Sequence, residues 1–275
     1  MSKYIPKIIG HTINFTSYFS SKYAAKLAVK IFSTPKKGRI SHEEADYLKS
    51  AVQEDIAYKD FSIKTYRWSG KKDTVLLAHG WESNAYRWKD LIDLLKKHDY
   101  NIIAIDAPAH GNSGSEIFNA VLYSECIHLV AKKFDTDIII GHSIGGTAAA
   151  ISLSNYSALS TKKLISLGAP SNFRGLVNNY IKMMAYNKKV SKAINAYYLK
   201  HFGQLPEYFS VANFSKNIKA KGLIIHDKKD RIISYRDALD YSKHYKNSEL
   251  IRTTGFGHGL KSEKVYNHIL DFLKA

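Results

Sequence analysis

The sequence contains a single cysteine, Cys126, among its 275 residues, so no disulfide can form within the chain. We interpret Cys126 as a small core residue on a helix. A chain that lacks disulfides makes no demand for an oxidising compartment. We therefore expect a cytoplasmic protein.

Acidic residues are scarce as well. The chain has 24 Asp and Glu against 41 Lys and Arg, which gives a formal net charge of +17. Such a charge favours contact with anionic surfaces, and peripheral contact with an anionic membrane is one interpretation of it. The lysines are scattered and no nucleic-acid-binding motif accompanies them. We therefore interpret most of the charge as a solvated surface and expect no nucleic-acid partner.

Two further absences narrow the class of protein. No apolar run reaches the ~20 residues that a membrane-spanning helix needs. The 12 histidines include no H-E-x-x-H motif and no Cys/His cluster at ligand spacing. The sequence therefore predicts neither a spanning helix nor a metal site.

The first 40 residues contain eight basic residues and no acidic one. Within this segment, residues 20–32 predict an amphipathic helix. Its apolar side consists of Phe19, Tyr23, Leu27 and Ile31, and its basic side consists of Lys22, Lys26 and Lys30. Three roles fit such a helix: packing on the domain that follows, lying on an anionic membrane surface, or targeting. We favour packing.

Strand and helix patterns alternate from residue 41 onwards. Ser41 and Glu44 form a capping box that predicts a helix to about residue 56. Residues 58–68 predict antiparallel edge strands. Further strands are predicted at residues 74–78, 101–105, 138–140, 163–167, 221–226 and 248–252, with helices at 84–97, 116–133, 234–246 and 261–273. This alternation is typical of an α/β fold with a mostly parallel sheet flanked by helices, and it breaks only at residues 171–215.

Residues 141–145 read Gly-His-Ser-Ile-Gly, between a β-branched run and a helix of small residues. A strand, a tight turn with Ser143 at its apex and a helix together form a nucleophile elbow. The serine of such a turn has a strained backbone, so its neighbours Gly141 and Gly145 must be small. The helix N-terminus then favours negative charge that develops beside the serine.

Three further loops resemble motifs of the α/β-hydrolase superfamily, of its esterase and serine-aminopeptidase-like kind. They are His79-Gly80-Trp81, residues 106–113 (with Ala109 where the family has Gly) and residues 254–259. The resemblance covers about residues 58–275 and implies an eight-stranded sheet with a small helical cap at about 171–215. We therefore predict a basic N-terminal extension at 1–40 and an α/β-hydrolase domain at 41–275.

Ser143, Asp230 and His258 follow predicted strands in the order Ser, acid, His, which resembles the order in this family. The carboxyl ends of parallel strands meet at one edge of a sheet, so residues distant in sequence can converge there. We predict Ser143 as the nucleophile, His258 as its base and Asp230 as the acid that orients His258. Asp227 stays an alternative acid, because it stands where the family has Gly.

The same resemblance implies further roles around the nucleophile. The backbone N–H groups of Trp81 and Ile144 are expected to form the oxyanion hole. Trp81, Met183 and Met184 are expected to contact the substrate, because an apolar cap suits an apolar group. His79 and His142 are interpreted as structural.

The sequence thus predicts a serine hydrolase that cleaves a carboxylic ester of a small molecule through an acyl-enzyme, without an organic cofactor or a metal. Thioesterase, amidase or peptidase, and C–C hydrolase reactions on the same triad remain open, because one fold hosts many reactions. A hypothesis from a different class is a non-catalytic binding module whose basic helix binds a membrane or a partner. The oligomeric state is not determined by the sequence.

Overall fold

Apolar, β-branched segments form the centre of the sheet. The computed structural model describes residues 4–156 and 160–275, and its strands form one eight-stranded sheet in the order β1-β2-β4-β3-β5-β6-β7-β8. Only the β1–β2 and β2–β4 pairs are antiparallel. The strands are β1 (Val52–Tyr58), β2 (Phe61–Trp68), β3 (Lys72–Ala78), β4 (Tyr100–Ile105), β5 (Ile138–His142), β6 (Lys163–Leu167), β7 (Lys221–Asp227) and β8 (Ser248–Thr253).

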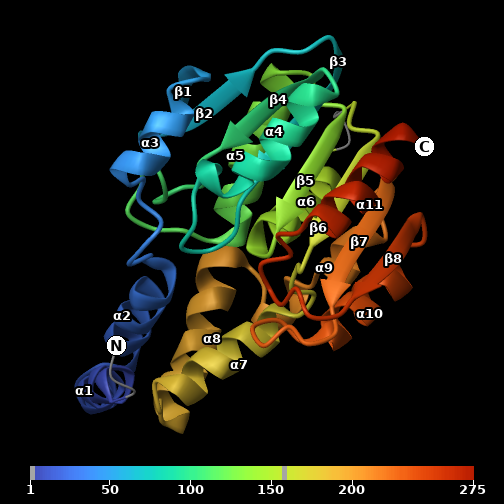
Figure 1. Ribbon diagram of the computed structural model, residues 1–275. Helices are drawn as coiled ribbons and strands as arrows, with labels where there is room; N and C mark the ends of the chain where they lie inside the picture. The colour runs from blue at the N-terminus through green and yellow to red at the C-terminus, as the bar shows by residue number, and fades with distance from the viewer. Residues whose placement is uncertain (1–3, 157–159) are drawn as a thin grey trace.

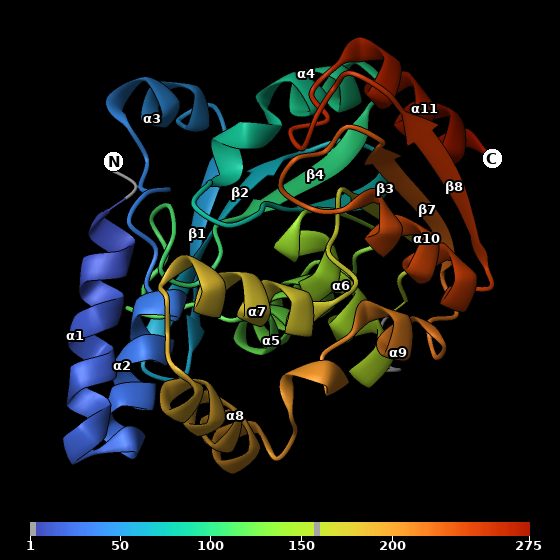
Figure 2. The ribbon, with the colours of Figure 1, turned by 90° about the horizontal axis from the view of Figure 1, so that it is seen from below.

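Helices cover both faces of the sheet, and each face has its own apolar core (Figure 2). One core is covered by α3 (His42–Leu48), α4 (Lys89–Lys97) and α11 (Glu263–Lys274), and the 3-10 turn Ala85–Trp88 precedes α4. The other core is covered by α5 (Ala120–Lys133), α6 (Ile144–Asn155), α9 (Val211–Ser215) and α10 (Tyr235–His244). This arrangement confirms the predicted α/β-hydrolase fold, because parallel strands are stable only when both faces are buried.

One expected element differs from the observed structure. The capping box at Ser41 and Glu44 does begin a helix, but this helix, α3, ends at Leu48, and Val52–Tyr58 forms β1. The predicted helix to residue 56 is therefore wrong. The residues of β1 extend because they pair along their whole length with β2, a contact that a local pattern does not report.

The insertion after β6 contains two helices, α7 (Phe173–Met183) and α8 (Lys188–Phe202), followed by the 3-10 turn Pro206–Tyr208. Its base is closed where the Val211 N–H donates to the Ser171 carbonyl at 3.0 Å. The Asp237 side chain of α10 accepts a further bond from the Ser171 N–H. Figure 1 shows α7 and α8 beyond the edge of the sheet to which the parallel strands point, so the insertion lies over the loops at the strand ends.

The N-terminal segment forms a hairpin of two helices, α1 (Ile5–Phe19) and α2 (Ser21–Ser33), beside α7 and α8 (Figure 1). The hairpin and the insertion share a third apolar cluster, which is separate from the two cores of the sheet. The predicted helix at 20–32 corresponds to α2, whereas α1 was not predicted. The side of α2 that packs centres on Ala24, Ala25, Ala28 and Val29, and Leu27 and Ile31 of the predicted apolar side are partly buried against the same cluster. Phe19 and Tyr23, which the sequence pattern placed on the packing side, are instead 79% and 54% exposed.

No helix within the described residues combines the length and the apolar composition needed to cross a bilayer.

Candidate active site

The turn between β5 and α6 holds Ser143 in a left-handed backbone conformation, with φ 52° and ψ −127°. Few residues other than glycine adopt positive φ, so the surrounding packing must hold the turn in place. The packing leaves no room for side chains beside it. A Cβ on Gly145 would lie 2.3 Å from the Ala78 carbonyl oxygen, and one on Gly141 would lie 2.5 Å from the Gly146 Cα.

Ser143, His258 and Asp230 lie in one hydrogen-bonded chain. The Ser143 Oγ lies 3.1 Å from the His258 Nε2, and the His258 Nδ1 lies 2.7 Å from the Asp230 Oδ2. A carboxylate can only accept, so the His258 Nδ1–H donates to Asp230 and the Nε2 is free to accept the serine proton. The structure therefore brings together the three residues that the sequence singled out, from loops after β5, β7 and β8.

The Asp230 side chain is fully buried but well satisfied. It accepts bonds from the backbone N–H groups of Ile232 and Ile233 at 2.8 and 3.0 Å. Burial alone would raise its pKa, but the bonds from His226, His258 and these two N–H groups hold the pKa of Asp230 far below its usual range. Asp230 is therefore an anion at any working pH.

Two further histidines contact residues of this hydrogen-bonded chain: His226 lies beside Asp230, and His142 lies beside His258. The buried His226 Nε2 lies 3.1 Å from the Ile233 carbonyl and 3.4 Å from the Asp230 Oδ2. The His142 Nε2–H donates to the His258 carbonyl at 2.9 Å, and burial keeps the pKa of His142 well below its usual value. The sequence reasoning gave His226 no role, although its place at the end of an apolar strand, four residues before Asp230, was a usable signal.

Asp227, the alternative acid, has different partners. Its Oδ2 accepts from the Thr253 hydroxyl and the Phe256 N–H at 3.0 and 2.9 Å, and its Oδ1 accepts from the Lys229 N–H at 2.8 Å. These bonds attach the β7 loop to the loop that carries His258. Asp227 thus fixes the loop and does not contact the imidazole.

The loop that carries Trp81 passes directly over Ser143. A Cβ on Gly80 would lie 3.0 Å from the Ser143 Cβ. His79 holds this loop, because its Nδ1–H donates to the Gly80 carbonyl at 2.7 Å and its Nε2 accepts from the Ala107 N–H at 2.9 Å. The N–H of Trp81 follows Gly80, that of Ile144 follows Ser143, and within the described part of the chain neither donates to a loop carbonyl. They are available to bind an oxyanion.

Asp106 anchors the neighbouring loop from a fully buried position. Its carboxylate accepts from the Ala85 N–H, the Tyr66 hydroxyl and the Asn112 N–H at 2.8 to 2.9 Å. Burial raises the pKa of Asp106 to about 6, because its effect outweighs that of these hydrogen bonds, which lower the pKa. Ala109, which stands where the family has Gly, has φ 64°, so the backbone still adopts the conformation that favours glycine.

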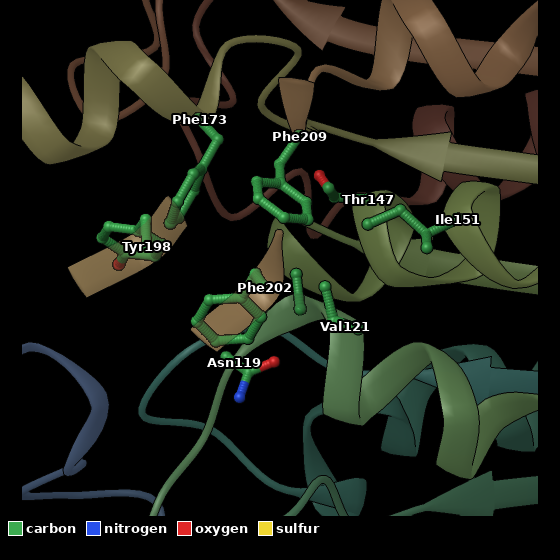
Figure 3. A pocket seen from close by; sticks show the side chains of 9 residues that line it. Asn119, Val121, Thr147, Ile151, Phe173, Tyr198, Phe202 and Phe209 are labelled. Atoms are coloured by element: carbon green, nitrogen blue, oxygen red, sulfur yellow. The ribbon is translucent and has the colours of Figure 1, made fainter. Parts of the chain in front are cut away.

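A small apolar cavity of about 30 Å³, part of it open to solvent, lies between α5, α6 and the cap (Figure 3). Thr147 and Ile151 line it from α6, and these residues lie one and two turns after Ser143 on the same side of the helix. The remaining lining residues are Asn119, Ala120 and Val121 of α5 and its N-terminus, and Phe173, Tyr198, Phe202 and Phe209 of the cap. The cavity therefore lies under the cap, about 6 to 12 Å along the α6 axis from Ser143, and its lining includes no residue of the triad.

The three predicted substrate contacts, Trp81, Met183 and Met184, are not among the residues that line this cavity. Met183 is 53% exposed, and Met184 is buried in the cluster that the cap shares with the hairpin, so neither lines the cavity. Trp81 packs against Phe118, the residue before the lining Asn119, with ring centroids 5.4 Å apart. Of the three residues, only Trp81 lies near both the nucleophile and the cavity. The described residues contain no group of three His, Cys, Asp or Glu side chains arranged to hold a metal ion.

Comparison with known proteins gives the same picture of the fold. A sequence model of the alpha/beta hydrolase family matches residues 75–244. A Mycoplasma pneumoniae protein assigned as esterase/lipase 3 is 29% identical over 125 residues, which are 44% of this chain and 45% of that protein. This chain thus matches less than half the length of that relative.

Two longer matches cover most of the chain. The AB hydrolase superfamily protein YisY of Bacillus subtilis is 22% identical over 72% of this chain and 90% of its own length. The structure of a Pyrococcus furiosus esterase superposes with a TM-score of 0.67 and 19% identity, over 88% of this chain and 97% of that one. At this identity, the structural likeness concerns the fold alone.

Proposed function

The chain belongs to the alpha/beta hydrolase family, and from this premise we propose that it is a serine hydrolase that cleaves carboxylic esters of small molecules. The observation that carries the proposal is the hydrogen-bonded chain from Ser143 through His258 to the buried anion of Asp230. The relatives assigned as esterases or lipases support the ester as the scissile group. The lone, buried Cys126 suits a reducing compartment, and we place the enzyme in the cytoplasm.

The proposed reaction has two steps that share one base. His258 accepts the Ser143 proton while the serine oxygen attacks the ester carbonyl, and the imidazolium then gives that proton to the leaving alcohol. In the second step, His258 accepts a proton from water as the water oxygen attacks the acyl-enzyme carbonyl, and the imidazolium returns that proton to the Ser143 oxygen as the carboxylic acid leaves. Asp230 holds the productive tautomer of His258 and stabilises the imidazolium in both steps.

The backbone N–H groups of Trp81 and Ile144 would stabilise the oxyanion of each tetrahedral intermediate. Donors that are fixed before the reaction are effective because they need no reorganisation when the charge develops, and loss of one such donor typically costs about 10²–10³-fold in kcat. The bonds of His79 to the Gly80 carbonyl and the Ala107 N–H support this role, because they fix the loop before substrate arrives.

The apolar cavity along α6 is the proposed site of the acyl group. Its aromatic lining, from Phe173, Phe202 and Phe209 among others, contains few polar groups, and burial of an apolar chain there is favourable. Because Thr147 and Ile151 follow Ser143 by about 6 and 12 Å along the helix axis, an acyl chain of medium length would reach from Ser143 to the cavity. We therefore expect faster hydrolysis of butyrate and octanoate esters than of acetate or palmitate esters.

The test is covalent labelling with a fluorophosphonate probe, with the adduct located by mass spectrometry. We expect labelling at Ser143 and none in the Ser143→Ala protein, whose kcat/KM should fall by about 10⁴-fold or more. Ser152→Ala is the matched control: this buried hydroxyl lies on the same helix and has no hydrogen-bond partner in the structure, so its loss should leave labelling intact. Folded protein that resists the probe would refute the proposal and favour the binding-module hypothesis.

A further inference from the structure

The hairpin presents a large apolar surface to solvent. Ile8, Phe15, Tyr18, Phe19 and Tyr23 are 54 to 79% exposed. Four of these residues lie on one side of α1, opposite the side on which Gly10, Ile13 and Ser17 are buried against the cap. We call these five residues the outer face. An exposed helix face rich in aromatic and branched side chains, interrupted by His11, is unusual on a soluble domain, and it marks a surface that binds something apolar.

Basic residues surround the outer face, and no acidic residue lies among them. The described segment from residue 4 to residue 42 contains seven Lys and Arg and no Asp or Glu, and residues 173–205 of the neighbouring cap contain no acid either. Lys7, Lys22 and Lys26 are exposed on the hairpin. Lys189 of α8 lies over the ring of Tyr18, which joins the two basic regions.

We propose that the outer face docks on an anionic lipid bilayer, with its aromatic side chains at the level of the headgroups and the surrounding lysines on the lipid phosphates. An apolar helix face bordered by lysines is the arrangement that binds such an interface, because the apolar area and the charge contribute together. A second copy of this chain is the other apolar occupant available. Symmetric pairing would, however, bring two faces together that carry only positive charge.

The hairpin is firmly attached to the cap, so docking also positions the cap. The Asn14 side chain donates to the Ala185 carbonyl at 2.9 Å and accepts from the Asn187 N–H at 2.8 Å. The Tyr180 hydroxyl donates to the Ala28 carbonyl at 2.9 Å. Tyr198 and Phe202 of α8 belong both to the cluster shared with the hairpin and to the lining of the cavity.

This attachment suggests the substrate class, an inference that rests on the proposed ester hydrolysis. Docking on lipid would hold the cap, and the apolar cavity beneath it, near the bilayer with only the hairpin between them. An ester with an apolar acyl chain dissolves in the bilayer and reaches the cavity from there. We therefore assign the natural substrate to lipid-soluble esters.

The docking test uses flotation with vesicles of phosphatidylcholine, with and without phosphatidylglycerol. The protein carries Ser143→Ala, so that binding is measured without hydrolysis of the vesicle lipids. We expect binding to phosphatidylglycerol vesicles to be at least about tenfold tighter than to phosphatidylcholine alone, and to weaken as salt is added. Phe15→Asp with Phe19→Asp should reduce this binding at least about tenfold.

Matched variants distinguish a specific effect of the outer face on vesicle binding from the effect of a changed net charge. Val52→Asp with Leu239→Asp replaces two exposed apolar residues outside the hairpin and cap, and it should bind vesicles as the parent does. Lys22→Glu with Lys26→Glu should weaken binding, whereas Lys96→Glu with Lys97→Glu on α4 should weaken it much less. Circular dichroism melting confirms that each variant is folded.

Equal binding by the parent and by the Phe15/Phe19 variant would overturn the proposal, as would a parent protein that does not bind phosphatidylglycerol vesicles. A dimer in solution that the Phe15/Phe19 substitutions dissociate, without vesicle binding, would also overturn it and assign the face to a second copy. The fluorophosphonate assay tests the proposed function separately. Its failure would leave docking intact, and vesicle binding without esterase activity would retain the surface but not the substrate class.

Discussion

The two aspartates that follow β7 offer the sharpest test of the proposed mechanism. Asp230 and Asp227 stand three residues apart in one loop, yet only Asp230 contacts His258. Replacement of each by Asn keeps the side chain's shape and removes its charge. We expect Asp230→Asn to abolish most of the catalysis and Asp227→Asn to reduce mainly the stability.

The size of each expected loss follows from the hydrogen bonds that the substitution changes. In the Asp230→Asn variant, the new amide would retain one oxygen for the N–H groups of Ile232 and Ile233, and its NH₂ would then face His258. An imidazole that accepts from this NH₂ carries its proton on Nε2 and cannot receive the proton of Ser143. Loss of the productive tautomer in this type of triad costs about 10⁴-fold in kcat.

Asp227→Asn has a different effect. One of its acceptors becomes a donor that faces the Lys229 N–H or the Phe256 N–H, which leaves a part-buried N–H without its acceptor. We expect a loss of about 1–3 kcal/mol in the free energy of unfolding. Because Phe256 lies two residues before His258, kcat should fall by about tenfold or less, which corresponds to a small displacement of the base.

Steady-state hydrolysis of p-nitrophenyl butyrate gives kcat and KM for both variants, and urea denaturation gives their stabilities. KM should change little in Asp230→Asn, since the carboxylate does not line the cavity. The reasoning fails if the two variants lose similar activity, or if Asp230→Asn retains more than about a tenth of the parental kcat.

Three further predictions concern specificity, pH and the hairpin. Ile151→Phe fills the cavity and should lower kcat/KM for octanoate relative to acetate esters by about 10–100-fold; an unchanged ratio of the two would show that the acyl chain binds elsewhere. The folded pKa of Asp106, about 6, lies above its ordinary value of 3.8, so its protonation stabilises the fold below about pH 3.8 and this contribution is lost as the pH rises through 6. The stability of the parent relative to Asp106→Asn should therefore decrease by about 3 kcal/mol over this range in urea titrations, and a flat difference would contradict the shifted pKa. A Cβ on Gly10 would lie 1.6 Å from the Met184 carbonyl oxygen, so Gly10→Val should separate α1 from the cap and remove hydrogen-exchange protection from α1. Thr12→Ala on the exposed side of α1 is the control, and equal protection in both variants would argue against the observed packing.

The centre of the fold could be predicted from sequence because its determinants are local. A strand buried on both faces must be apolar along its whole length, and Ile138, Ile139 and Ile140 meet that requirement without reference to any partner. The glycines around Ser143 are equally local, since each is needed where a Cβ would meet the backbone of β3 or α6. Residues that follow such strands could therefore be assigned to one edge of the sheet.

Elements outside the central sheet, such as α1, could not be predicted from local sequence patterns. α1 contains four Ile, two Thr and one Gly, which are weak helix formers, and its apolar residues lie on two opposite sides. No single apolar stripe appears, so the helical period is hidden. The helix is stabilised by tertiary contacts, such as those between Asn14 and the cap, that the sequence pattern does not contain.

The prediction that Met183 and Met184 contact the substrate illustrates the same difficulty. The cap helices bury apolar residues on one side against the hairpin and on another side against the cavity. Periodicity identifies apolar residues but not which neighbour each will meet. Met184 packs toward α1, where its carbonyl contacts Gly10, and the cavity is lined instead by aromatic residues farther along the chain.

Under the proposed function, these two kinds of element separate chemistry from substrate delivery. The catalytic loops are attached to the strand ends and to buried anchors such as Asp106 and Asp227, which belong to the cores of the sheet. The cap depends on a third cluster that it shares with the hairpin. A change in the hairpin should therefore alter KM for octanoate esters and leave the turnover of acetate esters nearly unchanged. The reaction and its access to apolar substrate can thus vary independently in this fold, since they rest on different clusters of side chains.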